Sequence, residues 1–540
     1  MAVTSIKNSV KHLELLDQLR GIAILAVLLF HSLSTVYGYD VLPWNGWFRG
    51  FSVPDSFWCF LPISIFNVGV PVFFVVSGFC IHASFQQQGQ QWDSFFIRRL
   101  FRICPAYLVA LGFFTLLYMH HFRLDLWSGP VWTQLLAHSF FVHNYSTSTI
   151  GAVNGSFWSM AVEFQLYLIY PVLLFLVGKL GWRRALGILA AIEILIRAAN
   201  GIVETLGAAE TAAGQVSWMF FISPLGYWFS WAMGAALADA FLKNEPLPFL
   251  RSPLKLWLGL VLASYFVRPL DGFQFLLFAL ITATVISRQL SKAKSENKLP
   301  AKKFALLQKI GLWSYSIYLL HQPLLNVYSY AINRLIAAEN RPALIAFLIV
   351  VFTWSIVIPL SYLWYQILEL NGIAWGKRII QKLEKQSSGK ILSPKKQSPK
   401  PVSISAGKQW RLACTLLILT ASSFLVGFEL MPVEPAANNN LAWSLATNPE
   451  AKNRDGVRAV ALAEDACRQT QYKQAIMIGT LAAAYAEAGR FDEAVMAAQQ
   501  ACALAKMNGE TNLLQRNQEL MAVYQNHQPY RDEAAVIKKK

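Results

Sequence analysis

Residues 16–33 read LDQLRGIAILAVLLFHSL, an apolar run that contains a charged residue and a titratable one, Arg20 and His31. Eleven helical steps separate them, which is about 1100°, or about 20° beyond three full turns. Both side chains therefore share one helix face and lie about 16 Å apart along the axis. Ionisable groups are costly inside a membrane, so this cation and this imidazole are candidate functional residues.

Composition places this run in a membrane protein. The chain has 540 residues, of which 55% are hydrophobic, and its mean hydropathy is +0.39. Repeated apolar runs of about 20 residues predict an all-α, polytopic membrane helical bundle in the lipid bilayer. The net charge of +17 comes from Lys and Arg that cluster between the runs, which is typical of membrane topology and predicts no nucleic-acid partner.

We expect about ten core spans and one extra span, and a re-entrant or interfacial segment at 130–145. The expected spans are 19–38, 66–85, 104–121, 157–178, 185–203, 217–241, 253–268, 272–288, 310–332, 342–369 and 412–430. The basic loops fall on one side if the spans alternate, and that side is cytoplasmic by the positive-inside rule. This predicts a multi-pass protein of the cell inner (plasma) membrane with a cytoplasmic N-terminus.

The pattern divides the chain into four parts. Residues 10–380 form the expected membrane domain, and 381–411 form a basic linker rich in Ser, Pro and Lys that is expected to be disordered and cytoplasmic. An extra transmembrane helix at 412–430 then carries the chain outward. Residues 437–530 are Ala-rich and helical in pattern, and we expect them to form a small soluble domain in the periplasm or another extracytoplasmic space.

The soluble tail resembles tetratricopeptide repeats, in which small side chains allow close helix contact. The matching small and aromatic positions are Ala482, Tyr485, Gly489, Phe491, Ala494, Ala498 and Ala501. A generic Ala-rich bundle is the alternative. Helical repeats of this kind predict a protein partner for the tail.

Four arginines are expected in one layer near the cytoplasmic surface. FFIRRLFRICPAY, residues 95–107, contributes Arg98, Arg99 and Arg102, and Arg20 enters the same layer behind Asp17. Guanidinium groups bind phosphates through paired hydrogen bonds, so this cluster is a candidate site for a phosphate-bearing ligand. Positive-inside anchoring is the alternative explanation for the group in 95–107.

Glu163 and His321 are the other deep polar candidates. Glu163 should lie about 9 Å below the outer surface and His31 about 12 Å, so we expect a carboxylate–imidazole pair that makes His31 a general base. A protonated structural glutamate is the alternative. His321 should reach a depth similar to His31, although a histidine satisfied between helices explains it equally well. No metal site or Gly-rich phosphate loop is predicted.

Five segments at these positions resemble the membrane acyltransferase-3 family of bacterial sugar O-acyltransferases. One departure is Phe164, where many members have a second acidic residue. The segments are LLDQLRGIAILAVLLFH (15–31), GVPVFFVVSGF (69–79), FFIRRLFRICPAY (95–107), FWSMAVEFQLYLIYP (157–171) and SYSIYLLHQP (314–323).

The resemblance implies acetyl-CoA or another acyl-CoA as donor substrate, with no permanently bound cofactor. It implies a hydroxyl of a cell-envelope carbohydrate or glycolipid, such as a polysaccharide or lipopolysaccharide, as acceptor. The implied roles divide into catalysis, donor binding and support. They fall on His31, Arg20 and Glu163 for catalysis, on Arg98, Arg99 and Arg102 for the donor, and on Asp17, Ser77 and His321 for support.

Two other classes remain open from the sequence. A polytopic transporter would also have many spans and buried charge, but it would not consume acyl-CoA. A non-catalytic membrane scaffold that presents the helical tail would keep its function after His31→Ala, whereas an enzyme would lose its general base.

Overall fold

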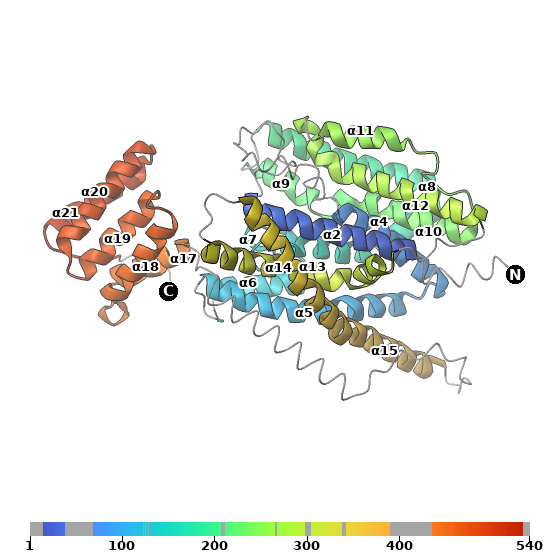
Figure 1. Ribbon diagram of the computed structural model, residues 1–540, viewed down its shortest axis with the longest axis horizontal. Helices are drawn as coiled ribbons and strands as arrows, with labels where there is room; N and C mark the ends of the chain where they lie inside the picture. The colour runs from blue at the N-terminus through green and yellow to red at the C-terminus, as the bar shows by residue number, and fades with distance from the viewer. Residues whose placement is uncertain are drawn as a thin grey trace. The chain divides into compact units, whose positions relative to one another are not determined.

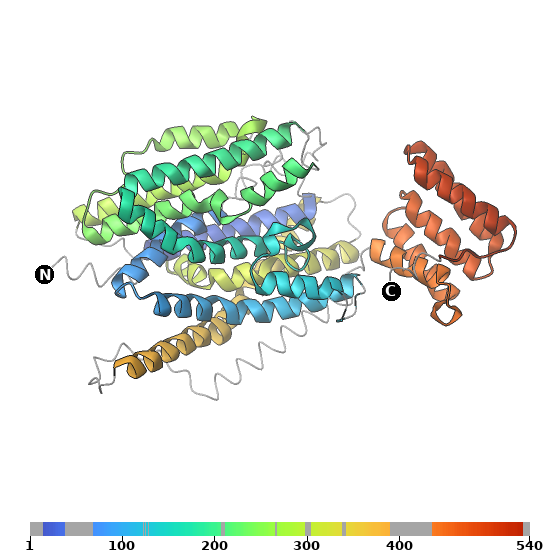
Figure 2. The ribbon, with the colours of Figure 1, turned by 180° about the vertical axis from the view of Figure 1, so that it is seen from behind.

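The computed structural model describes a helical chain (Figures 1 and 2), and no strand occurs among the residues it describes. These residues divide into two compact units, 1–115 with 132–430 and 116–131 with 431–540. The predicted extra helix at 412–430 and most of the predicted linker lie outside the described residues. The described residues are 14–37, 69–122, 124, 126–127, 129–206, 211–264, 267–296, 304–336, 342–388 and 435–532.

The predicted all-α membrane class is confirmed. Six helices of the described residues are long and apolar enough to cross a membrane. They fall in α2 (Glu14–Tyr37), α4 (Gly69–Gln87), α5 (Trp92–Phe122), α8 (Phe157–Thr205), α12 (Gln274–Glu296) and α14 (Pro342–Trp364) with its continuation.

Two of the predicted spans, 157–178 and 185–203, fall within α8. The helix is kinked at Gly181, whose φ of 74° and ψ of 162° are not helical. A positive φ favours glycine, because a Cβ would clash with the backbone there. The kink therefore separates the part of α8 that contains Glu163 from the part predicted as the next span.

One predicted span is broken in the structure. We expected a continuous helix over 217–241, but the chain forms α9 (Ala212–Phe221), a short 3-10 turn (Pro224–Tyr227) and α10 (Trp228–Lys243). Pro224 has no backbone N–H to donate, so a regular helix does not continue through it. The segment at 130–145 contains only α6 (Gly129–Ser139) and the 3-10 turn His143–Tyr145, followed by α7 (Thr147–Ile150).

The rest of the membrane unit consists of further helices in chain order. The helix α15 covers the start of the predicted linker at 381–411. The remaining elements are α11 (Leu254–Ser264), the 3-10 turn Arg268–Phe273, α13 (Ala305–Ile336), the π-helical turn Tyr365–Glu369 and α15 (Leu370–Ser388).

Close glycine contacts align the helices that carry the site. A Cβ at Gly311 of α13 would lie 1.8 Å from the Asp17 carbonyl oxygen of α2, and one at Gly21 would lie 2.2 Å from the Leu307 carbonyl oxygen. Because membrane helices gain mainly by close packing, small residues allow this approach. The two helices run parallel, since Asp17 lies by Gly311 and His31 lies by His321.

A second close contact joins α4 to α10. A Cβ at Gly78 would lie 2.0 Å from the Trp231 carbonyl oxygen, and one at Gly234 would lie 1.9 Å from the Val75 carbonyl oxygen. This packing brings the Trp231 indole against Ser77, where it takes part in the site described below.

The C-terminal unit contains consecutive helices packed around small side chains. Its buried core includes Ala459, Ala463, Ala482, Ala494 and Ala501. Gly489, with a φ of 77°, lies in the turn between two of the helices. The helices are α17 (Pro435–Thr447), α18 (Gly456–Gln469), α19 (Ala475–Glu487), α20 (Phe491–Met507) and α21 (Thr511–Gln525). Its assignment to tetratricopeptide repeats stays a prediction.

Candidate active site

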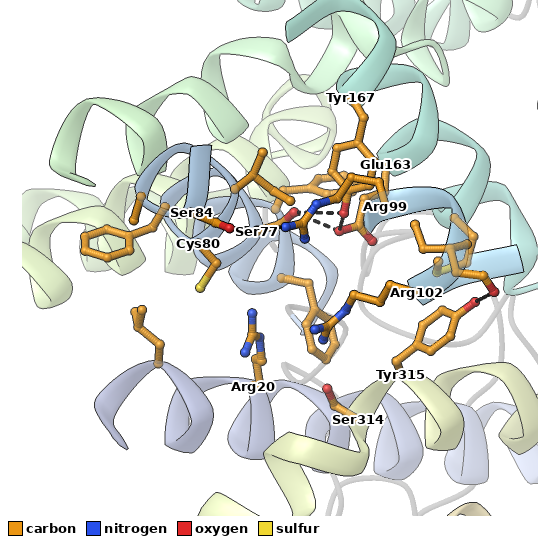
Figure 3. Close-up of a pocket in the computed structure, with 18 of the residues that line it drawn as sticks. Arg20, Ser77, Cys80, Ser84, Arg99, Arg102, Glu163, Tyr167, Ser314 and Tyr315 are labelled. Carbon is orange, nitrogen blue, oxygen red and sulfur yellow. Dashed lines mark hydrogen bonds between the residues drawn. The ribbon is translucent and has the colours of Figure 1, made fainter. Parts of the chain in front are cut away.

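A cavity of about 310 Å³ lies among α2, α4, α5, α8 and α13 (Figure 3). The helix α4 forms a long wall, because six of its lining residues follow one another at steps of three and four. These six residues are Val70, Phe73, Ser77, Cys80, Ser84 and Gln87. The seventeen helical steps from Val70 to Gln87 extend over about 25 Å, so the wall suits an elongated ligand.

Three arginines of the described residues line the cavity: Arg20 from α2, and Arg99 and Arg102 from α5. Their guanidinium groups point into it in Figure 3. Arg20 Nη1 donates to Asp17 Oδ1 at 3.0 Å, and Arg99 Nη2 donates to Ser84 Oγ at 3.5 Å. Each guanidinium has five N–H donors, so most of them stay available to an anion. This part of the cavity is suited to bind phosphate.

Glu163 provides a carboxylate to the lining of the cavity. Its Oε1 accepts a hydrogen bond from Ser77 Oγ at 2.7 Å and one from Tyr167 Oη at 2.5 Å. Trp231 Nε1 donates to Ser77 Oγ at 3.3 Å, so the donors run in one direction toward Glu163. These bonds hold the carboxylate in a fixed orientation facing the arginines, as Figure 3 shows.

The structure separates Arg98 from the other predicted donor-binding residues. Arg98 is not among the residues that line the cavity, and its acidic neighbour is Glu384 of α15. Neighbouring residues on a helix point about 100° apart, so Arg98 and Arg99 face different surroundings. The structure therefore does not bring Arg98 to the cavity that Arg99 and Arg102 line, and its role in donor binding stays a prediction.

His31 and His321 form a pair deeper in the bundle. Their ring centroids are 5.0 Å apart and the rings are inclined by 55°. His321 is fully buried, and its Nδ1 lies 2.8 Å from the Tyr318 carbonyl oxygen. A carbonyl oxygen only accepts, so Nδ1 carries the proton. In neutral His321, Nε2 is then an acceptor, and it lies 3.3 Å from Ser156 Oγ, which donates to Gln322 Oε1.

The expected pairing of His31 with Glu163 is not what the structure shows. Glu163 lines the cavity, whereas His31 does not, and the ring beside His31 is that of His321. The helical rise predicted the depths of His31 and Glu163 in the membrane. The side chain that lies next to His31 depends instead on which helices pack together. Here the parallel contact of α2 with α13 brings the two histidines together.

Several site residues were missed from the sequence. Tyr167 lies four residues after Glu163 and therefore on the same helix face. Tyr318 lines the cavity, and its ring centroid is 5.3 Å from that of His321. Ser159 lines the cavity too, and its Oγ is 2.6 Å from Tyr318 Oη. The four-residue spacing of Tyr167 from Glu163 was the one sequence signal, and it could have identified Tyr167.

Taken together, the fold and the cavity define a helical membrane protein with an internal, positively charged binding site. The model of the acyltransferase 3 family, described as an acyltransferase domain, matches residues 13–360. The chain therefore belongs to this family of acyltransferases.

Three known proteins show partial similarity. Acyltransferase MdmB of Streptomyces mycarofaciens is 26% identical over 270 residues, which are 47% of this chain and 67% of that protein. The regulator of hypoxia-inducible factor 1 of Caenorhabditis elegans is 28% identical over 194 residues, 32% of this chain and 38% of that protein. An uncharacterized Haemophilus influenzae protein is 32% identical over 120 residues, 20% and 49% of the two chains. No solved structure is significantly similar.

Proposed function

We propose that the chain is an integral membrane O-acyltransferase that moves an acyl group, acetyl in the first instance, from acyl-CoA to a hydroxyl of a cell-envelope carbohydrate or glycolipid. Its family membership supports the acyl transfer. The observation that carries the choice of donor is the cavity, where Arg20, Arg99 and Arg102 face one lining carboxylate, Glu163. This excess of positive charge suits the phosphates of coenzyme A.

The proposed reaction uses His31 as general base. The arginines hold the donor phosphates, and the thioester extends along α4 toward the histidine pair. His31 removes the proton from the acceptor hydroxyl as its oxygen bonds to the thioester carbonyl carbon. The carbon–sulfur bond then breaks, and the coenzyme A thiolate leaves and takes up a proton. His321 orients the His31 ring, and Glu163 with Ser77 fixes the cavity wall.

We extend the proposal to the membrane that holds the enzyme and to its orientation there. The basic loops support an inner-membrane protein with a cytoplasmic N-terminus, so the donor would enter from the cytoplasm. The C-terminal helical domain would then lie outside the membrane, on the acceptor side, after the predicted span at 412–430. Such a domain would suit a protein partner that delivers the acceptor.

The test is mass spectrometry of cell-envelope glycans from cells with the gene, without it, and with His31→Ala. We expect a mass increase of one acyl unit only with the unchanged protein. Purified protein should also release free coenzyme A from acetyl-CoA when those glycans are supplied. Identical glycan masses in all three strains, together with no thiol release, would rule out the proposed reaction. A transporter or a scaffold would give that result.

A further inference from the structure

The cavity changes character along α4. Ser84 and Gln87 belong to the later part of the helix, where Arg99 and Arg20 also lie. Val70 and Phe73 belong to the first turns, and the apolar lining there continues with Phe74 and Met160. A ligand that spans the cavity would therefore place its charged groups by the arginines and its apolar end near Phe73.

An aromatic contact closes the apolar end. The ring centroids of Phe73 and Tyr318 are 6.3 Å apart, and the rings meet edge to face at 76°. Tyr318 also lies against His321, with 5.3 Å between centroids. Phe73 and Tyr318 are called the aromatic gate below: both line the cavity, and Tyr318 contacts Phe73 and also His321 of the histidine pair.

The two sides of the aromatic gate differ in how firmly they are held. Tyr318 Oη lies 2.6 Å from Ser159 Oγ and donates to the Ser156 carbonyl oxygen at 3.0 Å. Tyr318 as a whole is 6% exposed. Phe73 has no polar atom that could fix it, and it is only partly buried. Polar contacts therefore hold Tyr318, whereas packing alone holds Phe73.

We propose that Phe73 sets the length of the acyl group, so that the donors are short-chain thioesters such as acetyl- and propionyl-CoA. The inference rests on the proposed function, because it concerns the same donor. In this proposal the acyl group passes Phe73 on its way to His31, and the contact of Phe73 with Tyr318 restricts the space for it. Longer chains would collide with the ring contact.

The test compares acetyl-, propionyl-, butyryl- and hexanoyl-CoA with the purified full-length protein in proteoliposomes, using envelope glycans as acceptor and thiol release as readout. One methylene in an apolar pocket changes kcat/KM by about 10-fold or more. We expect the unchanged protein to prefer acetyl or propionyl. Phe73→Ala should raise the ratio of hexanoyl to acetyl kcat/KM by at least about 10-fold.

Phe73→Leu is a milder second variant in case the alanine variant is unstable, and it should shift the ratio in the same direction. Phe347→Ala is the matched control, since Phe347 is a 62% exposed phenylalanine of α14, and it should leave the ratio unchanged. If both Phe73 variants transferred acetyl groups with the chain-length preference of the unchanged protein, the role of Phe73 would be overturned and the proposed function would stand. Failure of the unchanged protein to use any thioester would overturn both.

Discussion

The arginine-lined part of the cavity and the histidine pair are built in opposite ways. The arginines keep most of their donors free, and the Arg20 side chain is 22% exposed. His321 is fully buried, and hydrogen bonds hold it in one orientation. The first arrangement suits the reversible binding of a charged ligand, and the second suits proton transfer away from water. In the function we propose, binding and chemistry therefore occupy separate places, with the aromatic gate between them.

The largest effect should come from His31. His31→Ala removes the proposed general base and should lower kcat by about 100-fold or more, with little change in the KM for acetyl-CoA. Initial rates of thiol release give both constants. Ser32→Ala is the matched neighbour, because the Ser32 hydroxyl only donates to the Leu28 carbonyl within the helix. Full activity of His31→Ala would remove the histidine pair from the mechanism.

Substitution of a cavity arginine should change the KM for acetyl-CoA. Arg102→Ala removes a charge-assisted contact worth about 1.5–3 kcal/mol, so the KM for acetyl-CoA should rise by about 10- to 100-fold. Arg98→Ala is the control within the same helix, because Arg98 faces Glu384 instead of the cavity. If both variants raised KM equally, the separation of Arg98 from the site would be incorrect.

A packing change should disturb both regions at once. Gly311→Ala would place a Cβ 1.8 Å from the Asp17 carbonyl oxygen, and overpacking of this kind costs about 1–3 kcal/mol. We expect a lower midpoint in thermal unfolding of the detergent-solubilised protein. Gly112→Ala is the matched control, since a Cβ there meets nothing within 4 Å. Equal midpoints for the two variants would argue against the close contact of α2 with α13.

The smallest effect should come from Ser156, which acts through His321. Ser156→Ala removes the hydroxyl that lies between His321 Nε2 and Gln322 Oε1; a neutral hydrogen bond is worth about 1 kcal/mol, so kcat should fall by about fivefold. The donor KM should not change, and Ser156→Thr should restore the rate because it keeps the hydroxyl. A rise in KM, or a threonine variant as slow as alanine, would indicate that Ser156 has a packing role only.

Much of this arrangement could be predicted from the sequence. Hydropathy predicted the helical membrane class. The eleven-residue spacing predicted that Arg20 and His31 share one face of α2; in the structure Arg20 lines the cavity, and His31 lies against His321 of α13. The common starting side of two spans predicted similar depths for His31 and His321. Depth follows from the helical rise of each span alone.

Lateral contacts could not be predicted in the same way. They depend on which helices pack together, and here Gly21 and Gly311 allow α2 to approach α13. That packing decides that His31 lies beside His321 instead of Glu163. The direction of Arg98 likewise depends on α15, whose packing against α5 is permitted by Gly372, where a Cβ would lie 2.4 Å from the Phe101 carbonyl oxygen.

The separation of binding from chemistry is tested most directly by the affinity for coenzyme A, measured by calorimetry on the purified protein and two variants. We predict that His31→Ala binds coenzyme A as tightly as the unchanged protein, while Arg102→Ala binds it about 10- to 100-fold more weakly. Loss of affinity in His31→Ala with unchanged affinity in Arg102→Ala would contradict the account.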